Sequence, residues 1–275
     1  ALTLVFGVLN ILNLAHGNLY AIGAYAAASA VGGYFAGGNP PYFDYAVMVL
    51  SAALVAIVLG PLLERGLLRL FYGRDEVLLV LVTYALFLIL EDVTKLIWGV
   101  NPYYAYEPYG ELGNVGIGHL TYVGYDLMLI GFAFLTGILL WIGLNRTRSG
   151  KIVLAVIHDR EISRAMGINV TKVFVGAFTV GVFLAALGGA LTAPKISVQP
   201  GISVTVILLS FAVVVIGGLG SVEGAAIAAL LVGLARSAAI HLMPEAELFI
   251  VYLVMAGVLA FRPEGLFQRV QARKI

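Results

Sequence analysis

The residues with the most potential for chemistry are charged side chains inside long apolar runs, where an ionisable group is costly. Glu91, Asp92 and Lys95 form one such group. Glu91 and Lys95 are four residues apart and would share one face of a helix. Two interpretations stay open, a self-paired ion couple near a membrane surface or a proton relay. Four further charges are expected near the same outer face, as rim charges or as contacts to a soluble protein: Lys195, Arg236, Glu245 and Glu247.

Polar and glycine-rich stretches are the second kind of candidate. Asn10 to Asn18 places amides and an imidazole between two apolar segments. This composition favours an interrupted helix, and irregular backbone at membrane depth occurs where it lines a cavity or is buried in protein. Gly217 to Gly224 holds four glycines in eight residues, which breaks a helix and predicts either a tight turn or a mobile gate. The candidates for a translocation path or gate are therefore Asn10, Asn13, His16, Gly217, Gly218 and Gly220.

Patterns of catalysis and metal binding are missing from the sequence. The chain has no Cys, and its four histidines lack metal-ligand spacing. No Ser–His–Asp set or acid–base pair of carboxylates stands out. Gly150-Lys151 fails the phosphate-loop pattern, because Ile152 replaces Ser or Thr and Asn145 replaces the first glycine. We expect no catalytic residue, no metal and no cofactor, and any ATP-driven work must use the motor of another chain.

The composition requires a membrane. Of the 275 residues, 61% are hydrophobic and 11% charged, with a net charge of +1 and a mean hydropathy of +1.01. A soluble domain carries about 25% charged residues, and a balanced charge gives no basis for nucleic-acid binding. Soluble enzymes, disordered tails and secreted disulfide scaffolds are excluded.

Apolar runs near the ~20 residues that cross a bilayer predict an all-α polytopic protein with about eight transmembrane helices, some interrupted. One transmembrane domain is expected over 1–275. Ala1 to Leu9 is interpreted as half of a span truncated at its N-terminus. Prolines are expected between spans, with Pro61 at a span end. The predicted spans are 18–36, 44–63, 77–98, 126–145, 173–193, 203–219, 225–243 and 248–261.

Basic residues predict the orientation, because cytoplasmic connections carry the excess of Lys and Arg. An eight-span count places three basic clusters on one side, and the connection 99–125, which lacks Lys and Arg, on the other. We therefore expect the clusters and the C-terminus in the cytoplasm. The clusters are Arg65, Arg69 and Arg74; Arg146, Arg148, Lys151, Arg160, Arg164 and Lys172; and Arg262, Arg269, Arg273 and Lys274.

The second basic connection predicts a docking element. Thr147 and Ser149 are candidate N-caps, Lys151 to Met166 has no Gly or Pro, and Gly167 supplies a stop. These signals predict a short charge-rich helix. Its mixed charge favours a groove on a soluble partner over an interfacial helix among lipid headgroups, which would be more purely basic. The predicted apolar stripe of this helix is Ile152, Ala155, Val156 and Ile162.

Along nearly its whole length the chain resembles the permease subunits of high-affinity branched-chain amino acid ABC importers, specifically the shorter of two paired permeases. The resemblance is carried by LTLVFGVLNILNLAHGNLYAIGAY, ERGLLRLFYGRDEVL, LILEDVTKLIWG, GKIVLAVIHDREISRAMGINV, FAVVVIGGLGSVEGA and FRPEGLF.

The resemblance implies import of branched-chain or other hydrophobic amino acids across a bacterial or archaeal cytoplasmic (inner) membrane. It also implies a second permease, two cytoplasmic ATP-binding subunits and a periplasmic substrate-binding protein as partners. Residues 150–168 match the coupling helix that contacts the ATPase, and His158 stands where many relatives have Glu. The motif positions are Gly150, Ala155, Asp159, Arg160 and Gly167.

Two other classes are weighed against this one. An ion- or proton-coupled secondary transporter would need ionisable residues near the bilayer midplane and commonly an inverted repeat, and neither is identified. A non-transporting membrane scaffold does not account for the interrupted helices. The exact solute, the lining side chains and pairing with a like or an unlike permease stay open.

Overall fold

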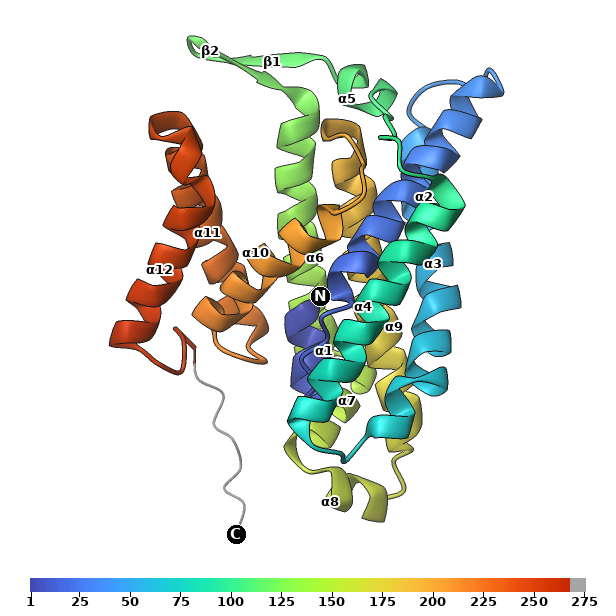
Figure 1. The fold of residues 1–275 in the computed structure, drawn as a ribbon, viewed down its shortest axis with the longest axis vertical. Helices are drawn as coiled ribbons and strands as arrows, with labels where there is room; N and C mark the ends of the chain where they lie inside the picture. The colour runs from blue at the N-terminus through green and yellow to red at the C-terminus, as the bar shows by residue number, and fades with distance from the viewer. Residues whose placement is uncertain (268–275) are drawn as a thin grey trace.

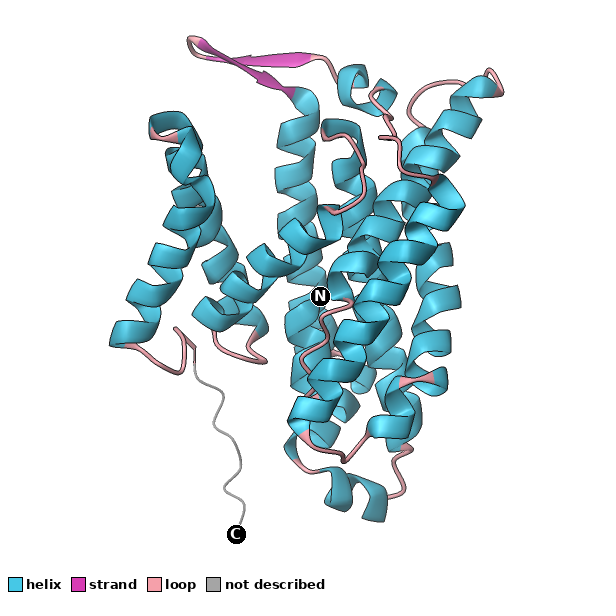
Figure 2. Cartoon of the chain, in the orientation of Figure 1, coloured by secondary structure: helices cyan, strands magenta, loops and turns pink. Residues whose placement is uncertain are grey.

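The structure is a computed structural model that describes residues 1–267, and the described chain is almost entirely helical (Figure 2). Six helices are long and apolar enough to cross a membrane: α2 (His16–Ala36), α3 (Asp44–Gly66), α4 (Glu76–Trp98), α6 (Gly124–Arg146), α9 (Val170–Thr192) and α11 (Val222–Leu242). Two shorter apolar helices, α10 (Ile202–Gly217) and α12 (Glu247–Phe261), lie where the other two spans were predicted. The chain is thus an all-α multi-pass membrane protein, as predicted.

The remaining elements are short. α1 (Leu2–Leu9) occupies the apolar start, and α7 (Arg148–His158) and α8 (Arg160–Ala165) form the connection between α6 and α9. The connection between α4 and α6 holds α5 (Glu107–Glu111) and an antiparallel hairpin of β1 (Asn114–Ile117) and β2 (Leu120–Val123). Three single 3-10 turns are η1 (Leu68–Phe71), η2 (Ala193–Lys195) and η3 (Pro244–Ala246).

Small residues let α9 lie at the centre of the bundle against α2 and α3. A Cβ on Gly23 of α2 would overlap the backbone of Ala186 on α9. A Cβ on Gly60 of α3 would lie 2.6 Å from the Thr179 hydroxyl oxygen. Close approach of backbones is how helices associate where lipid supplies no hydrophobic drive between them.

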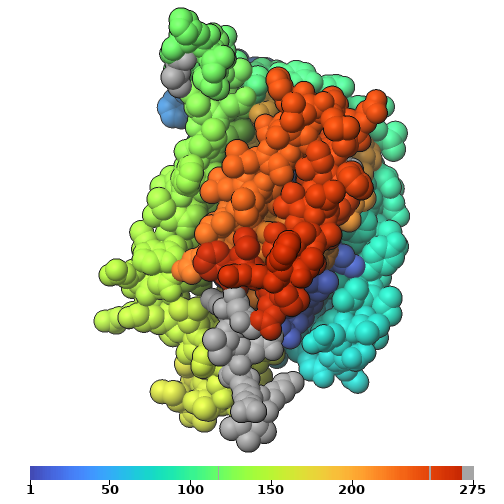
Figure 3. Space-filling model, turned by 90° about the vertical axis from the view of Figure 1, so that its left-hand side faces the viewer, coloured from blue at the N-terminus to red at the C-terminus, as the bar shows by residue number. Residues whose placement is uncertain are grey.

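The two ends of the molecule differ in charge as predicted. α7 and α8 lie at one end, together with the end of α3, and the hairpin projects from the other (Figure 1). In the space-filling view the hairpin projects at the upper end of the molecule, and the α7–α8 segment lies at the lower end (Figure 3). Arg65 is in the last turn of α3 and Arg164 in the last turn of α8, so the two belong to elements at the same end, as the span count required. Arg269, Arg273 and Lys274 lie outside the described residues.

Pro61 departs from its predicted place. It lies inside α3, which continues to Gly66 instead of ending near residue 63. The following turn stays helical because Leu63 and Glu64 are buried against the bundle, with 8% and 0% of their surface exposed. Packing of that turn outweighs the hydrogen bond that a proline removes.

Candidate translocation and coupling sites

The chain is not helical between α1 and α2, and a side chain of α4 satisfies backbone groups there. α1 ends at Asn10, whose backbone is left-handed with φ 56°. Beyond it, the Thr83 hydroxyl donates to the Leu12 carbonyl at 3.1 Å and accepts the Leu14 N–H at 3.4 Å. Irregular backbone at membrane depth needs such partners because lipid supplies none. The interruption predicted from residues 10–18 is therefore present between residues 10 and 15.

Arg160 of α8 contacts the same interruption from the end where α7 and α8 lie. Its Nη2 donates to the carbonyl oxygens of Val8 and Leu9 at 3.3 and 3.1 Å. Its guanidinium also lies over the ring of Phe174 on α9, 5.0 Å from the centroid. The last carbonyls of a helix lack partners within it and carry partial negative charge, so a cation is favourable there. The Arg160 side chain thus faces α1 and α9.

Two polar candidates of the interruption are buried and incompletely bonded. Asn13 accepts the Ala15 N–H at 3.1 Å through Oδ1, but its Nδ2 has no partner among the described residues. Both ring nitrogens of His16 also lack a described partner. Buried polar atoms normally find one, so these two side chains are exceptions within the described bundle. Asn10 is exposed, and its observed role is to end α1.

A second interruption lies at the start of α10. After α9 the chain turns back toward the middle of the molecule, where α10 begins (Figure 1). Glu91 of α4 accepts the Gly201 N–H at 2.8 Å and the Ser203 hydroxyl, and Asn18 of α2 donates to it at 3.3 Å. A carboxylate is well placed there, because the free N–H groups of a helix start carry partial positive charge.

The predicted ion couple of Glu91 and Lys95 is wrong. Lys95 pairs with Asp92 at 3.2 Å, and both side chains are exposed to a large extent. Glu91 turns toward α10 instead, and no Lys, Arg or His among the described residues lies within ion-pair distance of it. Three donors on neighbouring elements decide its orientation, not the helical spacing.

The two interruptions are adjacent because α4 supplies a side chain to each. Thr83 and Glu91 are eight residues apart on α4, so about two helical turns separate them. Gly17 brings the beginnings of α2 and α10 together, since a Cβ there would overlap the carbonyl oxygen of Ser203. Neither Thr83 nor Ser203 was among the sequence candidates. The available signal for Thr83 was a threonine within the largely apolar first half of α4.

The connection between α6 and α9 forms two helices where one was predicted. The Asp159 backbone is extended (φ −151°), and its Oδ1 accepts the N–H groups of Glu161 and Ile162, each at 2.8 Å. Asp159 is thus an N-cap that starts a new helix. Thr147 caps α7 as predicted, by accepting the Gly150 N–H at 3.0 Å, whereas Ser149 lies inside α7. Gly167, with φ 82°, ends α8 as predicted.

Part of the predicted apolar stripe is exposed in the structure, where the connection breaks at Asp159. Val156 is fully buried, but Ile152 is 40% and Ile162 60% exposed. Ala155 and Met166 are exposed too, so within residues 1–267 several apolar side chains of α7, α8 and the following residue are exposed beside charged ones. We call these side chains the docking patch, which consists of Ile152, Ala155, Ile162 and Met166.

Gly150 determines how closely α7, which carries part of the docking patch, packs on α6. It is buried in the first turn of α7. A Cβ at this position would overlap the carbonyl oxygens of Gly143 and Leu144 at the end of α6. Gly150 therefore lets α7 fold back closely on α6.

The glycine-rich run between α10 and α11 is a close-packed turn. A Cβ on Gly217 would lie 2.5 Å from the backbone of Gly224, and Gly218 has φ 97°. The FRPEGLF motif docks on this turn, because the Phe267 N–H donates to the Gly217 carbonyl at 3.2 Å. Gly220 has φ 83°, and a Cβ on it would lie 3.4 Å from the Cα of Gly7 on α1. The structure displays a tight turn in this run, and its role as a gate stays a prediction.

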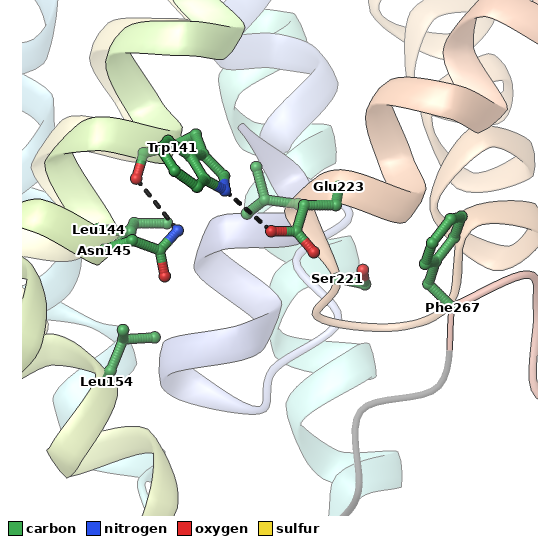
Figure 4. A pocket seen from close by; sticks show the side chains of 8 residues that line it. Trp141, Leu144, Asn145, Leu154, Ser221, Glu223 and Phe267 are labelled. Carbon is green, nitrogen blue, oxygen red and sulfur yellow. Dashed lines mark hydrogen bonds between the residues drawn. The ribbon is translucent and has the colours of Figure 1, made fainter.

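A cavity of about 250 Å³ lies where this turn approaches α6 and α7 (Figure 4). Trp141 of α6 donates from Nε1 to Glu223 of α11 at 3.0 Å across it. Leu154 of α7 and Ser221 of the turn line it as well. The connection formed by α7 and α8, which we call the docking segment, therefore borders the same space as the glycine-rich turn.

Three of the four outer charges are paired within the chain. Lys195 contacts Asp126 at 2.7 Å, and Arg236 forms an ion pair with Glu247. Both pairs are partly exposed, which fits the rim-charge interpretation.

Comparison with known proteins identifies a family of transport permeases. Residues 1–259 match the family model described as "Branched-chain amino acid transport system / permease component". The permease BraD of Pseudomonas aeruginosa, from a high-affinity branched-chain amino acid transport system, is 26% identical over 99% of this chain and 91% of its own length.

Two further relatives extend the comparison. LivH of Escherichia coli K12, named for the same kind of transport system, is 24% identical over 99% of this chain and 91% of its own. The ribose import permease RbsC of the same strain is 28% identical over 81% of this chain and 67% of its own. No solved structure matches the chain significantly.

Proposed function

The chain belongs to the family of permease components of branched-chain amino acid transport systems, and on that premise we propose that it forms half of the membrane pathway of an ATP-driven importer. The observation that carries the proposal is the docking patch, whose apolar residues are exposed beside charged ones at the α7–α8 end of the protein. Such a surface fits a groove on a soluble motor subunit. The nearby helix interruptions supply elements that such a motor can move.

The proposed cargo is a branched-chain or other hydrophobic amino acid. BraD and LivH are named for branched-chain amino acid transport, and they align with nearly all of this chain. The ribose permease among the relatives indicates that the scaffold itself accepts different solutes. We therefore assign selectivity mainly to the external binding protein.

The proposed partners are a second, unlike permease, two ATP-binding subunits and a periplasmic binding protein. The ATP-binding subunits would contact the docking patch, which puts the α7–α8 end and the C-terminus in the cytoplasm. The binding protein would contact the hairpin end, where Leu120 and Tyr122 are 61% and 40% exposed. This orientation implies the cytoplasmic (inner) membrane and follows the rule that basic connections stay inside.

The proposed mechanism is alternating access. ATP-driven closure of the motor shifts α7 and α8, and the interrupted helices reorient around a path between the two permeases. The ligands must bind the two states differently for the coupling to work. The orphaned atoms of Asn13 and His16 and the turn at Gly217, Gly218 and Gly220 are the proposed path and gate groups.

The test places a charge in the docking patch of the whole complex in proteoliposomes. Met166→Glu should abolish co-purification of the ATP-binding subunits and ATP-driven amino acid uptake. Leu242→Glu is the matched control, because Leu242 is 78% exposed, like Met166 at 77%, but ends α11 at the opposite end. Retained co-purification and uptake in Met166→Glu would overturn the docking assignment. Uptake driven by a proton gradient without the ATP-binding subunits would indicate a secondary transporter instead.

A further inference from the structure

Arg160 joins two parts of the protein that sequence separates by about 150 residues. It is the first residue of α8, in the docking segment, yet its guanidinium reaches the last carbonyls of α1. Those carbonyls directly precede Asn10, where the helix is interrupted. A single side chain therefore connects the docking segment to the interruption.

The environment of Arg160 makes this contact hard to replace. Within residues 1–267 it forms no ion pair, so its described polar partners are the two carbonyls. Its planar face is covered by Phe174, which is itself buried. Burial lowers the pKa of Arg160 below its usual value, which reflects the cost of bringing the charge to this place. If α8 moved, the carbonyls of the buried residues Val8 and Leu9 would lose a charged donor, which is costly for a buried acceptor.

α8 is built as a separate short unit. Asp159 starts it with its own cap, and Gly167 ends it with a backbone that few other residues adopt. Ser163 is its one buried residue, and the side chains on both sides of it are exposed. Such a unit can shift as a whole between two end points, and small shifts of this kind are amplified at packed interfaces.

We propose that Arg160 is a positioning residue that transmits the position of the docking segment to the α1–α2 interruption. The inference rests on the proposed function. When the motor displaces α8, the guanidinium withdraws from Val8 and Leu9, the end of α1 loses its charged donor, and the interruption rearranges. Arg160 thus acts behind the docking patch and not within it.

Arg164 provides a matched control. It lies one turn further along α8, is exposed, and makes no side-chain hydrogen bond with a described residue. It carries the same charge toward the same end of the protein but does not reach α1. A contact with the ATP-binding subunits would depend on Arg164 as much as on Arg160.

The experiment compares Arg160→Gln, Arg160→Lys and Arg164→Gln in the complete complex in proteoliposomes. Arg160→Gln should keep the ATP-binding subunits and the basal rate of ATP hydrolysis, while amino acid uptake per ATP falls about tenfold. Arg160→Lys should recover part of that ratio, because it keeps a cationic donor, and Arg164→Gln should leave the ratio unchanged. Parallel loss of ATP-binding subunits and uptake in Arg160→Gln would overturn the proposal, as would an unchanged ratio.

A distance measurement tests the movement itself. Because the chain has no Cys, spin labels can be placed specifically at Leu12→Cys, in the interruption, and Leu88→Cys, on the exposed face of α4. The distance between them should change on ATP trapping with Arg160 and stay constant with Arg160→Gln. An equal change in both would overturn the inference. Absence of ATP-driven uptake by the unmodified complex would instead overturn the proposed function.

Discussion

The Glu91 carboxylate on α4 accepts the Gly201 N–H at 2.8 Å, directly before the first turn of α10. It thus acts as the N-terminal cap of a helix that lies 110 residues further along the chain. α10 has no capping side chain of its own at Gly201, so the interruption before it depends on a group from another helix.

Removing this cap should destabilise the protein. Glu91→Ala leaves the Gly201 N–H, the Ser203 hydroxyl and the Asn18 amide without their shared acceptor, at a cost of about 1–3 kcal/mol. Glu91→Gln should cost less because it keeps one acceptor oxygen. Thermal unfolding of the purified complex measures both. Asp92→Asn is the control, and since Asp92 is 74% exposed it should shift stability by less than about 0.5 kcal/mol.

Thr83→Val should loosen the interruption between α1 and α2. The change keeps the shape of the side chain but removes the hydroxyl that bonds Leu12 and Leu14, which we expect to cost about 1–3 kcal/mol. Amide hydrogen exchange at Leu14 should become faster. Thr94→Val is the matched control, because the Thr94 hydroxyl bonds only Leu90 of its own helix. Equal exchange at Leu14 in the two variants would contradict the assignment.

Gly150→Ala should displace α7 from α6. The added Cβ would overlap the carbonyl oxygens of Gly143 and Leu144, and overpacking of this kind costs about 1–3 kcal/mol. We expect weaker binding of the ATP-binding subunits, measured by co-purification, together with a lower unfolding temperature. Gly137→Ala serves as the control, since a Cβ there meets no atom within 4 Å. An unaffected Gly150→Ala complex would show that α7 has room to shift.

Glu111 should make stability depend on pH. Burial, together with the neighbouring Asp44 carboxylate, raises the pKa of Glu111 above its usual value, against the opposing effect of the Tyr42 N–H that it accepts. A raised pKa of an acid stabilises the fold below about pH 4.3, its unfolded value, and this contribution is lost as pH rises through the folded pKa. Unfolding temperatures of the wild type and Glu111→Gln should therefore diverge with rising pH, with the variant becoming the more stable. Parallel curves would contradict the prediction.

Hydropathy within short windows of the sequence determined where the long apolar helices lie. Apolar runs must be helical in lipid, because every backbone group has to find its partner within the segment. The same logic located the interruption near Asn10 and the turn at Gly217, since asparagine and glycine favour chain reversals at any position. The N-cap role of Asp159 was missed, because one helix was predicted through this position, although aspartate before a helical run is a start signal.

Only the tertiary structure decided which groups meet. Glu91 binds Gly201 and Ser203 instead of Lys95, and Arg160 faces α1 instead of the surface. Helical spacing fixes which residues share a face, but the arrangement of neighbouring helices decides which donors and acceptors that face encounters. A buried charge follows its distant partners, because an unsatisfied charge in lipid costs more free energy than a local ion pair at the surface returns.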